Sequence, residues 1–209
     1  MDLSTPPRRR RATRDTDIRD DPRAAELRAV ILDLVARLGY DRVTMDSIAL
    51  AAKASKTTVY KRWPSKASLV IDAVREHAAT LLTDTGGTGS LRDDILAIVS
   101  QTAAKLNEEM DLVIGLVAAA HRDDELMTAV AEHIRVPGET IGRLPIQRAI
   151  DRGELPPDSN TLLIAEVGMP MLMHRALWRE PIDDAFVTHI VDDILLPLLQ
   201  PPAARHEAD

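Results

Sequence analysis

Hydroxyl and amine side chains are concentrated in residues 44–66, which read TMDSIALAAKASKTTVYKRWPSK. With Arg42 included, the stretch carries six cations and one acid, a net charge of +5. Serine, threonine and lysine side chains hydrogen-bond to base edges and phosphate oxygens, so this composition predicts a surface that contacts nucleic acid. The candidate contact residues are Thr44, Ser55, Lys56, Thr57, Thr58, Tyr60, Lys61 and Lys66. The alternative is a basic helical hairpin that faces only water.

The histidines give no comparable signal for catalysis or metal binding. His121, His174 and His189 each stand alone, without the His-x-x-x-His, Glu-x-x-His or serine-elbow patterns that such chemistry uses. The segment 83–89, TDTGGTG, lacks the Gly-Lys-Ser/Thr and the preceding strand of a phosphate loop. The chain has no cysteine, which excludes a disulfide framework and a thiolate metal site. We therefore expect no enzyme activity, no catalytic residue, no metal and no cofactor.

Helix signals divide residues 44–66 into two short helices and the start of a third. Thr44 can cap the first helix, and Ser55 can cap a second helix at 56–62. Pro64 stops the second helix, because the residue before a proline avoids helical geometry. The apolar residues that can anchor the two helices are Ile48, Ala49, Ala52, Val59 and Trp63. A helix, a tight turn and a short helix form the helix-turn-helix unit, whose second helix lies in the DNA major groove.

These residues resemble the amino-terminal domain of the tetracycline-repressor (TetR) family. Such domains typically read Gly-Tyr…Thr…Ile-Ala…Ala…Ser-Lys…Thr-hydrophobic-Tyr…Phe/Trp-Pro-Ser-Lys. The matching elements here, within about residues 23–75, are Gly39-Tyr40, Thr44, Ile48-Ala49, Ala52, Ser55-Lys56, Thr58-Val59-Tyr60 and Trp63-Pro64-Ser65-Lys66. Lys53-Ala54 departs from the family pattern, which usually has Gly-Val in the turn, so a side chain replaces a permissive glycine.

The resemblance implies a mechanism and a quaternary structure. In the proteins that the chain resembles, the helix at 65–82 moves the DNA-binding heads when a ligand binds, and Lys66 at its start contacts a phosphate. Their final two helices pair with those of a second copy across a two-fold axis. We therefore expect a homodimer that is formed through the last two helices of the chain.

Composition predicts the class of fold. The chain has 209 residues, of which 45% are hydrophobic but only 2% aromatic, so its core must be aliphatic. Strand-forming residues are not clustered and no period-two alternation persists, which indicates an all-α protein of about nine helices. No apolar run approaches the length of a membrane span and no signal peptide is visible. We expect a cytoplasmic protein without membrane contact.

Charge is distributed unevenly along the chain. The total is −7, but residues 1–66 carry +6 and residues 67–209 carry −13. Such an asymmetry directs nucleic acid to one end of a molecule. The predicted division is a disordered basic arm at 1–20, a three-helix, homeodomain-like helix-turn-helix domain at 21–66, a connecting helix at 67–84, a helical effector-binding and dimerisation domain at 90–199 and a disordered tail at 200–209. Arg8 to Arg11 in the arm can follow the minor groove, or can serve solubility alone.

The elements outside the helix-turn-helix follow from apolar stripes and breakers. The first helix runs over 21–38 and Gly39 ends it; a flexible linker at 83–89 precedes a helix that Ser90 begins. Residues 112–120 are apolar on nearly all sides, which predicts a central, buried helix. A further helical stretch at 123–152 contains Pro137, which must kink or break it, and Pro145; Gly153 ends it. The last two helices are predicted at about 158–178 and 183–196.

The second domain is the expected place for a small-molecule pocket. The candidate lining residues are Leu116, Ala120, His121, Met169, Met173, His174, Leu177 and Trp178. Methionines adapt to ligands of several shapes, although a methionine stripe also occurs in plain cores. His121 can equally be an exposed residue at a helix end. Two prolines in one helical stretch often accompany a cavity or a bend, and the sequence does not separate these two readings.

The sequence thus favours a DNA-binding transcriptional regulator, a repressor that a small-molecule effector releases from a palindromic operator in double-stranded DNA. The alternative is a helical small-molecule-binding protein or enzyme whose DNA-binding-like head is idle. Retention of DNA in a salt-sensitive manner separates these two classes, because only the first requires it.

Overall fold

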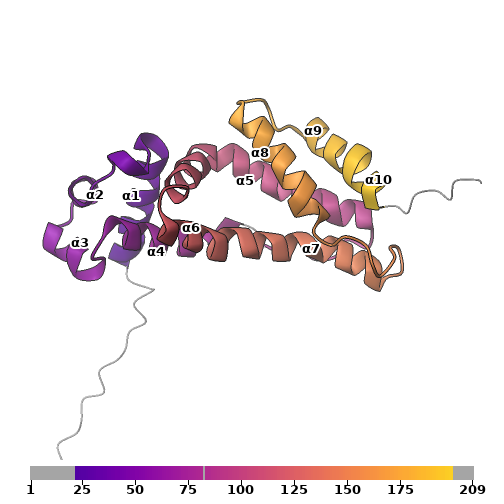
Figure 1. Cartoon of the computed structure of the whole chain (residues 1–209), viewed down its shortest axis with the longest axis horizontal. Helices are drawn as coiled ribbons and strands as arrows, with labels where there is room; N and C mark the ends of the chain where they lie inside the picture. The colour runs from indigo at the N-terminus through magenta and orange to yellow at the C-terminus, as the bar shows by residue number, and fades with distance from the viewer. Residues whose placement is uncertain (1–21, 82, 200–209) are drawn as a thin grey trace, which may run out of the picture.

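The computed structural model describes residues 22–81 and 83–199, so the predicted basic arm and the predicted tail lie outside the described residues. Within those ranges the chain is entirely helical, with eight continuous helices and no strand, which confirms the predicted all-α class. The helices form an elongated molecule with a small bundle at one end (Figure 1). We call residues 22–66 the head and residues 90–199 the body.

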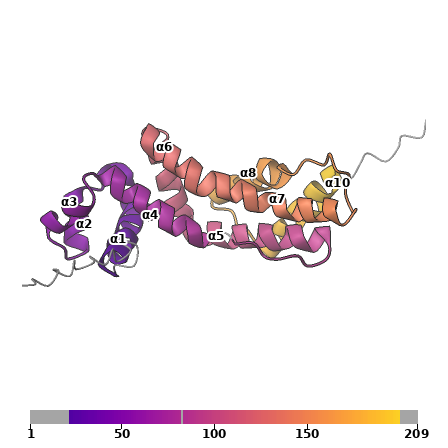
Figure 2. The ribbon, with the colours of Figure 1, turned by 90° about the horizontal axis from the view of Figure 1, so that it is seen from below.

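The head contains the predicted helix-turn-helix. Its elements are α1 (Pro22–Leu38), the single 3-10 turn η2 (Tyr40–Arg42), α2 (Met45–Ala51) and α3 (Lys56–Arg62). Gly39 ends α1 with a φ of 79°, as its expected role as a left-handed cap requires. α4 (Lys66–Leu81) then leads out of the head and passes along the body (Figure 2).

The turn between α2 and α3 keeps a left-handed residue although glycine is absent. Lys53 has a φ of 51°, a conformation that costs a residue with a Cβ about 1 kcal/mol. We therefore expect Lys53→Gly to raise the free energy of unfolding by about 1 kcal/mol in urea titrations. Lys53→Ala, which removes the same charge but keeps the Cβ, is the control and should show no gain. An equal gain in both variants would refute backbone strain as the cause.

α5 (Leu91–Ala120) joins the two ends of the molecule. It is a single long helix, but Glu109 has non-helical angles (φ −125°, ψ 15°), so its axis changes direction there. Beyond this kink α5 crosses α1 closely: a Cβ on Gly115 would lie 3.0 Å from the carbonyl oxygen of Val35. Residues 112–120 are therefore buried mainly against the head, rather than in the centre of the body.

Three prolines in the body are preceded by π-helical turns. η3 (Ala131–Arg135) precedes Pro137, η4 (Ile164–Gly168) precedes Pro170, and η5 (Ile190–Leu195) precedes Pro197. A proline has no N–H and its ring clashes with the carbonyl of the preceding turn, and a widened turn relieves that clash.

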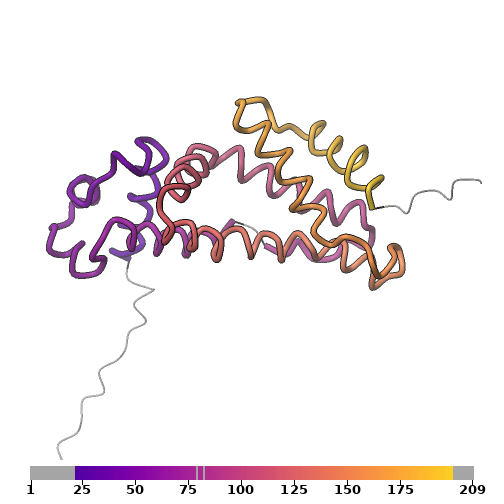
Figure 3. The backbone as a smooth tube through the Cα atoms, in the orientation of Figure 1, coloured from indigo at the N-terminus to yellow at the C-terminus, as the bar shows by residue number. Residues whose placement is uncertain are grey.

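Because of η3, Pro137 does not break its helix. The N–H of Val136 donates to the carbonyl of Ala131, a π-type bond, and α6 (Asp124–Val130), η3 and α7 (Val136–Asp151) form one continuous rod (Figure 3). The expected kink or break is thus replaced by a widened turn. α7 ends before Gly153, whose φ is 77°, as predicted.

The last two helices form a hairpin on the outside of α5 (Figure 1). The first comprises η4 and α8 (Met169–Leu177), and the second comprises α9 (Asp184–His189), η5 and α10 (Leu196–Leu199). The predicted start of this hairpin near residue 158 is wrong, since residues 156–162 form turns. Asn160 explains the later start, because its side-chain oxygen accepts the N–H of Leu162 at 2.9 Å and holds a turn.

The glycine-containing segment at 83–89 is non-helical, as predicted, but it is tied to the body at two points. The Asp84 carboxylate accepts from Arg148 of α7 at 2.5 and 2.6 Å. Asp94, in the first turn of α5, is fully buried and accepts from the Thr88 N–H at 2.6 Å, the Thr88 hydroxyl at 2.7 Å and Arg152 at 3.2 Å. These bonds anchor both ends of the segment.

Candidate nucleic-acid interface and effector cavity

The polar face of α3 points outward from a buried anchor. Val59 is completely buried and Trp63 is 4% exposed, so both anchor α3 and its C-terminus to the head, as predicted. The predicted contact residues on the other side are exposed: Ser55, Lys56, Thr57, Thr58, Tyr60 and Lys61. Local sequence produces this arrangement, because a two-turn helix with one large apolar residue in its middle can bury only one side.

Three of the hydroxyl groups also cap helices. The Thr44 hydroxyl accepts the N–H of Ser47 at 3.1 Å at the start of α2. The Ser55 hydroxyl accepts the N–H of Thr58 at 3.0 Å at the start of α3, and the Ser55 and Thr58 side-chain oxygens lie 2.7 Å apart. Thr57 makes no side-chain hydrogen bond to any described residue. Its hydroxyl is therefore the one in α3 that can bind an outside group without losing an internal partner.

This difference predicts unequal effects of two similar substitutions. Thr57→Ala should reduce discrimination between specific and random DNA by about 1–3 kcal/mol, while the urea midpoint stays unchanged. Thr58→Ala keeps the backbone cap but removes the contact with the Ser55 hydroxyl, so part of its effect should appear in stability. Competition binding with specific and scrambled duplexes measures both. Equal losses on the two duplexes would contradict a base-reading role for Thr57.

The three predicted lysine contacts have different environments. The Lys56 ammonium lies 2.7 Å from Asp46 on the surface, and Lys61 is exposed without an ion pair to a described residue. Lys66 is half-buried: its ammonium donates to the Tyr40 carbonyl at 2.7 Å and lies 3.9 Å from the centre of the Tyr40 ring. Burial lowers the pKa of Lys66. A phosphate contact by Lys66 would require its ammonium to leave Tyr40.

A buried arginine ties α1 to α4, a feature that the sequence did not reveal. Arg28 is 5% exposed and forms ion pairs with Asp72, at 3.2 Å, and with Glu76. Trp63 also donates to Asp72 through its indole N–H at 3.2 Å. The head is therefore fastened to the first half of α4, and a movement of α4 carries α3 with it. No local sequence signal identifies a contact between residues so far apart in the chain.

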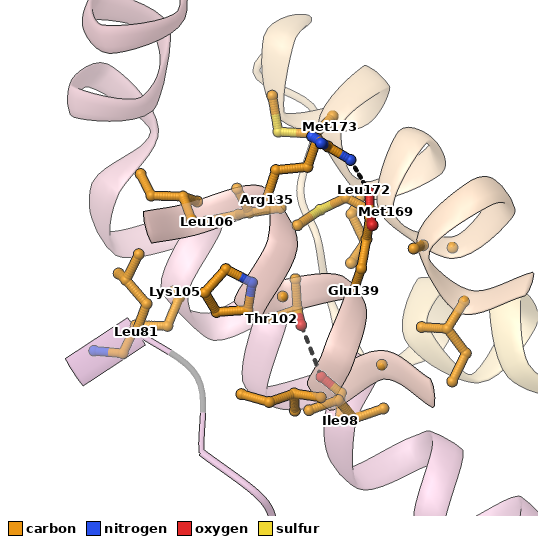
Figure 4. A pocket seen from close by; sticks show the side chains of 18 of the residues that line it. Leu81, Ile98, Thr102, Lys105, Leu106, Arg135, Glu139, Met169, Leu172 and Met173 are labelled. Atoms are coloured by element: carbon orange, nitrogen blue, oxygen red, sulfur yellow. Dashed lines mark hydrogen bonds and ion pairs between the residues drawn. The ribbon is translucent and has the colours of Figure 1, made fainter. Parts of the chain in front are cut away.

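A cavity of about 340 Å³ lies in the body between α4, α5, η3–α7 and η4–α8. Figure 4 shows Leu81 at the end of α4 on one side, and Met169, Leu172 and Met173 of α8 on the other. Its walls are mainly apolar, and Ala78 and Leu81 bring α4 into them. The cavity is therefore in contact with the same helix that carries the head.

The structure brings only two of the predicted pocket residues to this cavity, Met169 and Met173. Leu116 and Ala120 lie in the core of the head, because the last part of α5 packs on α1. His121 is the exposed residue that ends α5. The other three predicted residues lie outside the cavity on the hairpin of α8 and α9: His174, Leu177 and Trp178.

The polar residues of the cavity were missed by the sequence reasoning. They are Thr102, Lys105, Glu109, His133, Arg135 and Glu139. A signal for part of this set was present in Pro137 and Gly138, which also line the cavity. The prolines of this stretch thus accompany both alternatives considered from sequence, a distorted helix and a cavity.

Neither a metal site nor a membrane span is found in the described part of the chain. No group of three or more His, Asp or Glu side chains among residues 22–81 and 83–199 could hold a metal ion. None of the described helices is both long and apolar enough to cross a bilayer.

Comparison with known proteins identifies both parts of the chain. Residues 27–73 match the family of bacterial regulatory proteins designated tetR, and residues 85–194 match the tetracyclin repressor-like C-terminal domain. The chain is 40% identical over 186 residues to a DNA-binding transcriptional repressor TetR of Mycobacteroides abscessus, with 88% of this chain and 98% of that protein covered. An uncharacterized HTH-type transcriptional regulator of Mycobacterium bovis is 33% identical over 180 residues, covering 85% and 88%.

Solved structures agree with these matches. A TetR family transcription regulator superposes with a TM-score of 0.64 and 28% identity, over 87% of this chain and 100% of that chain. A TetR-family structure from Mesorhizobium loti has a TM-score of 0.69 over 85% of this chain and 95% of that chain, and its 21% identity supports the fold alone. The chain therefore belongs to the TetR family, whose members are helix-turn-helix transcriptional regulators that bind DNA and are not enzymes.

Proposed function

We propose that two copies of this chain bind a palindromic operator through their α3 helices, repress transcription there, and release the operator when a small molecule fills the cavity of the body. The observation that carries the first half is the outward polar face of α3 on the buried Val59. A relative with 40% identity that is a repressor supports the direction of regulation.

The second half rests on the position of α4. Its first half is held to the head by Arg28 and Asp72, and its last turn contributes Leu81 to the cavity wall. Next to the cavity, His77 of α4 lies 2.7 Å from Glu109, the residue at the kink of α5. A ligand that moves the end of α4 would change the spacing of the two α3 helices. Coupling of about 2–3 kcal/mol would lower operator affinity roughly thirtyfold to 150-fold.

A second connection between head and body lies at η2. Arg122, just after α5, pairs with Asp41 at 2.7 Å. Burial, followed by the neighbouring Asp123 carboxylate, raises the pKa of Tyr40. From this contact the rod of α6, η3 and α7 runs to the cavity, where η3 forms part of the wall. A ligand that displaces η3 would therefore also act on the head.

Apolar side chains left uncovered on the outer hairpin support the homodimer. Leu177 and Trp178 after α8 are 54% and 71% exposed, and Leu198 of α10 is 59% exposed. Large exposed apolar residues on one hairpin are typical of an interface, and a two-fold dimer buries the same surface on both copies. Trp178→Glu combined with Leu198→Glu should convert the protein to a monomer at micromolar concentration in analytical ultracentrifugation. A wild-type protein that sediments as a monomer would refute the dimer.

A gel shift tests the proposed DNA binding. The full chain is titrated into duplexes that cover the DNA on both sides of its coding region, with scrambled duplexes of equal length as the control. The proposal predicts retention of one flanking duplex at protein concentrations at which scrambled DNA stays free, with strong weakening as salt rises. Equal retention of all duplexes, or none, would refute it.

A further inference from the structure

The size of the cavity limits what can fill it. One water molecule occupies about 30 Å³ in the liquid, so 340 Å³ corresponds to about eleven groups of that size. A ligand of about ten non-hydrogen atoms therefore fits without expansion of the body. The inference that follows rests on the proposed function, because it takes this cavity as the effector site.

The charged groups at the wall already have partners inside the protein. Glu109 lies 2.7 Å from His77, and Arg135 lies 2.6 Å from Glu139 (Figure 4). The Lys105 ammonium lies 3.2 Å from Glu108, which is exposed. A charged ligand would therefore lose its hydration without gaining a free counter-ion, which is strongly unfavourable in an apolar cavity.

Two uncharged polar groups at the wall have spare hydrogen-bonding capacity. Half-buried His133 of η3 makes no side-chain hydrogen bond or ion pair with any described residue. Its imidazole can donate through one nitrogen and accept through the other. The Thr102 hydroxyl donates to the carbonyl of Ile98 at 2.8 Å, so its oxygen can still accept. The wall thus offers a small number of neutral hydrogen-bonding groups in apolar surroundings.

We propose that the cavity takes an uncharged, mainly apolar molecule of about ten non-hydrogen atoms that carries one hydroxyl or carbonyl group, and that His133 binds this group. The apolar part contacts the aliphatic and methionine side chains of α5 and α8, including Leu106, Met169 and Met173. His133 lies in the π-helical turn, so the group that recognises the ligand belongs to the rod that reaches the head.

Isothermal titration calorimetry with three molecules of equal chain length tests the ligand class. Octan-1-ol, octanoate and octylammonium are titrated into the intact protein at pH 7.5. The alcohol should bind at least tenfold more tightly than either ion, because only the ions carry a charge into the cavity. Equal or tighter binding of either ion would overturn the proposal, as would the absence of alcohol binding up to its solubility limit.

Variants test the position and the role of His133. His133→Leu should weaken alcohol binding about threefold to tenfold, the worth of one neutral hydrogen bond, and His133→Gln should recover most of it. His121→Leu makes the same change at an exposed position outside the cavity and should leave affinity unchanged. Gly142→Leu places a side chain on the cavity wall, where a Cβ meets only Ile164 at 3.9 Å, and should abolish binding in a folded protein.

These outcomes separate the ligand class from the proposed function. Unchanged affinity in folded His133→Leu or folded Gly142→Leu refutes the assigned site, and the gel shift remains unaffected by that result. Failure of the gel shift refutes DNA regulation while leaving the calorimetry intact.

Discussion

Reversing the charge of Lys56 and Lys61 is expected to weaken operator binding by about 10²–10³-fold at physiological salt. A dimer of the double variant Lys56→Glu, Lys61→Glu loses up to four phosphate contacts, each of which contributes about 0.9 to the slope of log affinity against log salt. Both side chains are exposed on α3, and the only described partner of either is Asp46. Fluorescence anisotropy over a series of salt concentrations gives the affinity and the slope together.

The control for this prediction is a charge reversal far from the head. Arg143 is exposed on α7 in the body, and Arg143→Glu should change neither the affinity beyond twofold nor the slope. Thermal unfolding should show that both variants are folded. If the double variant binds DNA with an unchanged salt slope, Lys56 and Lys61 do not contact phosphates.

Replacing Asp94 by alanine is expected to lower the free energy of unfolding by about 3 kcal/mol. The carboxylate is fully buried and accepts two hydrogen bonds from Thr88 and one from Arg152, so its loss leaves several buried donors without an acceptor. The effect should be near the low end for a buried ion pair, because the Arg152 side chain is 29% exposed and also pairs with Glu154. Urea titrations at one protein concentration measure it.

The dependence on pH provides an independent test of the same bonds. Burial alone would raise the pKa of Asp94, but the hydrogen bonds from Thr88 and Arg152 outweigh it and place the pKa below its usual range. The stabilisation is therefore complete above about pH 4, the usual pKa of an unfolded aspartate, and is lost as pH falls through the lower pKa of the folded state.

The wild type and Asp94→Ala should consequently differ most near neutral pH and converge as the solution becomes acidic. The exposed Asp192, which pairs with Arg92 at 2.7 Å, gives the control variant Asp192→Ala, with an expected urea midpoint close to that of the wild type. A difference between Asp94→Ala and the wild type that persists unchanged into acid would refute the role of the carboxylate.

Sequence predicted the head well because its determinants are local. The caps at Thr44 and Ser55, the stop at Pro64 and the inward-facing Val59 each depend on residues within one or two helical turns. Lys66 was placed by family resemblance at a phosphate, whereas its ammonium in the structure contacts Tyr40 in another element. That contact depends on how α4 packs on the head, which no local pattern encodes.

The cavity was predicted poorly because it is assembled from four segments far apart in the chain. Apolar periodicity identified Met169 and Met173, but it could not distinguish them from Leu116, which is equally apolar and belongs to the core of the head. The reason is the kink at Glu109, after which α5 leaves the body and packs on α1. The π-helical turns before prolines were also unpredicted, since proline alone indicates a disturbance and not the form that it takes.

Hydroxyl-radical footprinting on a duplex selected from random DNA by the full chain tests most directly whether α3 binds DNA. The account predicts two protected half-sites whose centres lie about 34–36 Å apart or a multiple of that distance, related by two-fold symmetry, and both absent with Lys56→Glu, Lys61→Glu. Selection that enriches no sequence, or a footprint that the double variant reproduces in full, would contradict the claim that α3 is the DNA-binding helix.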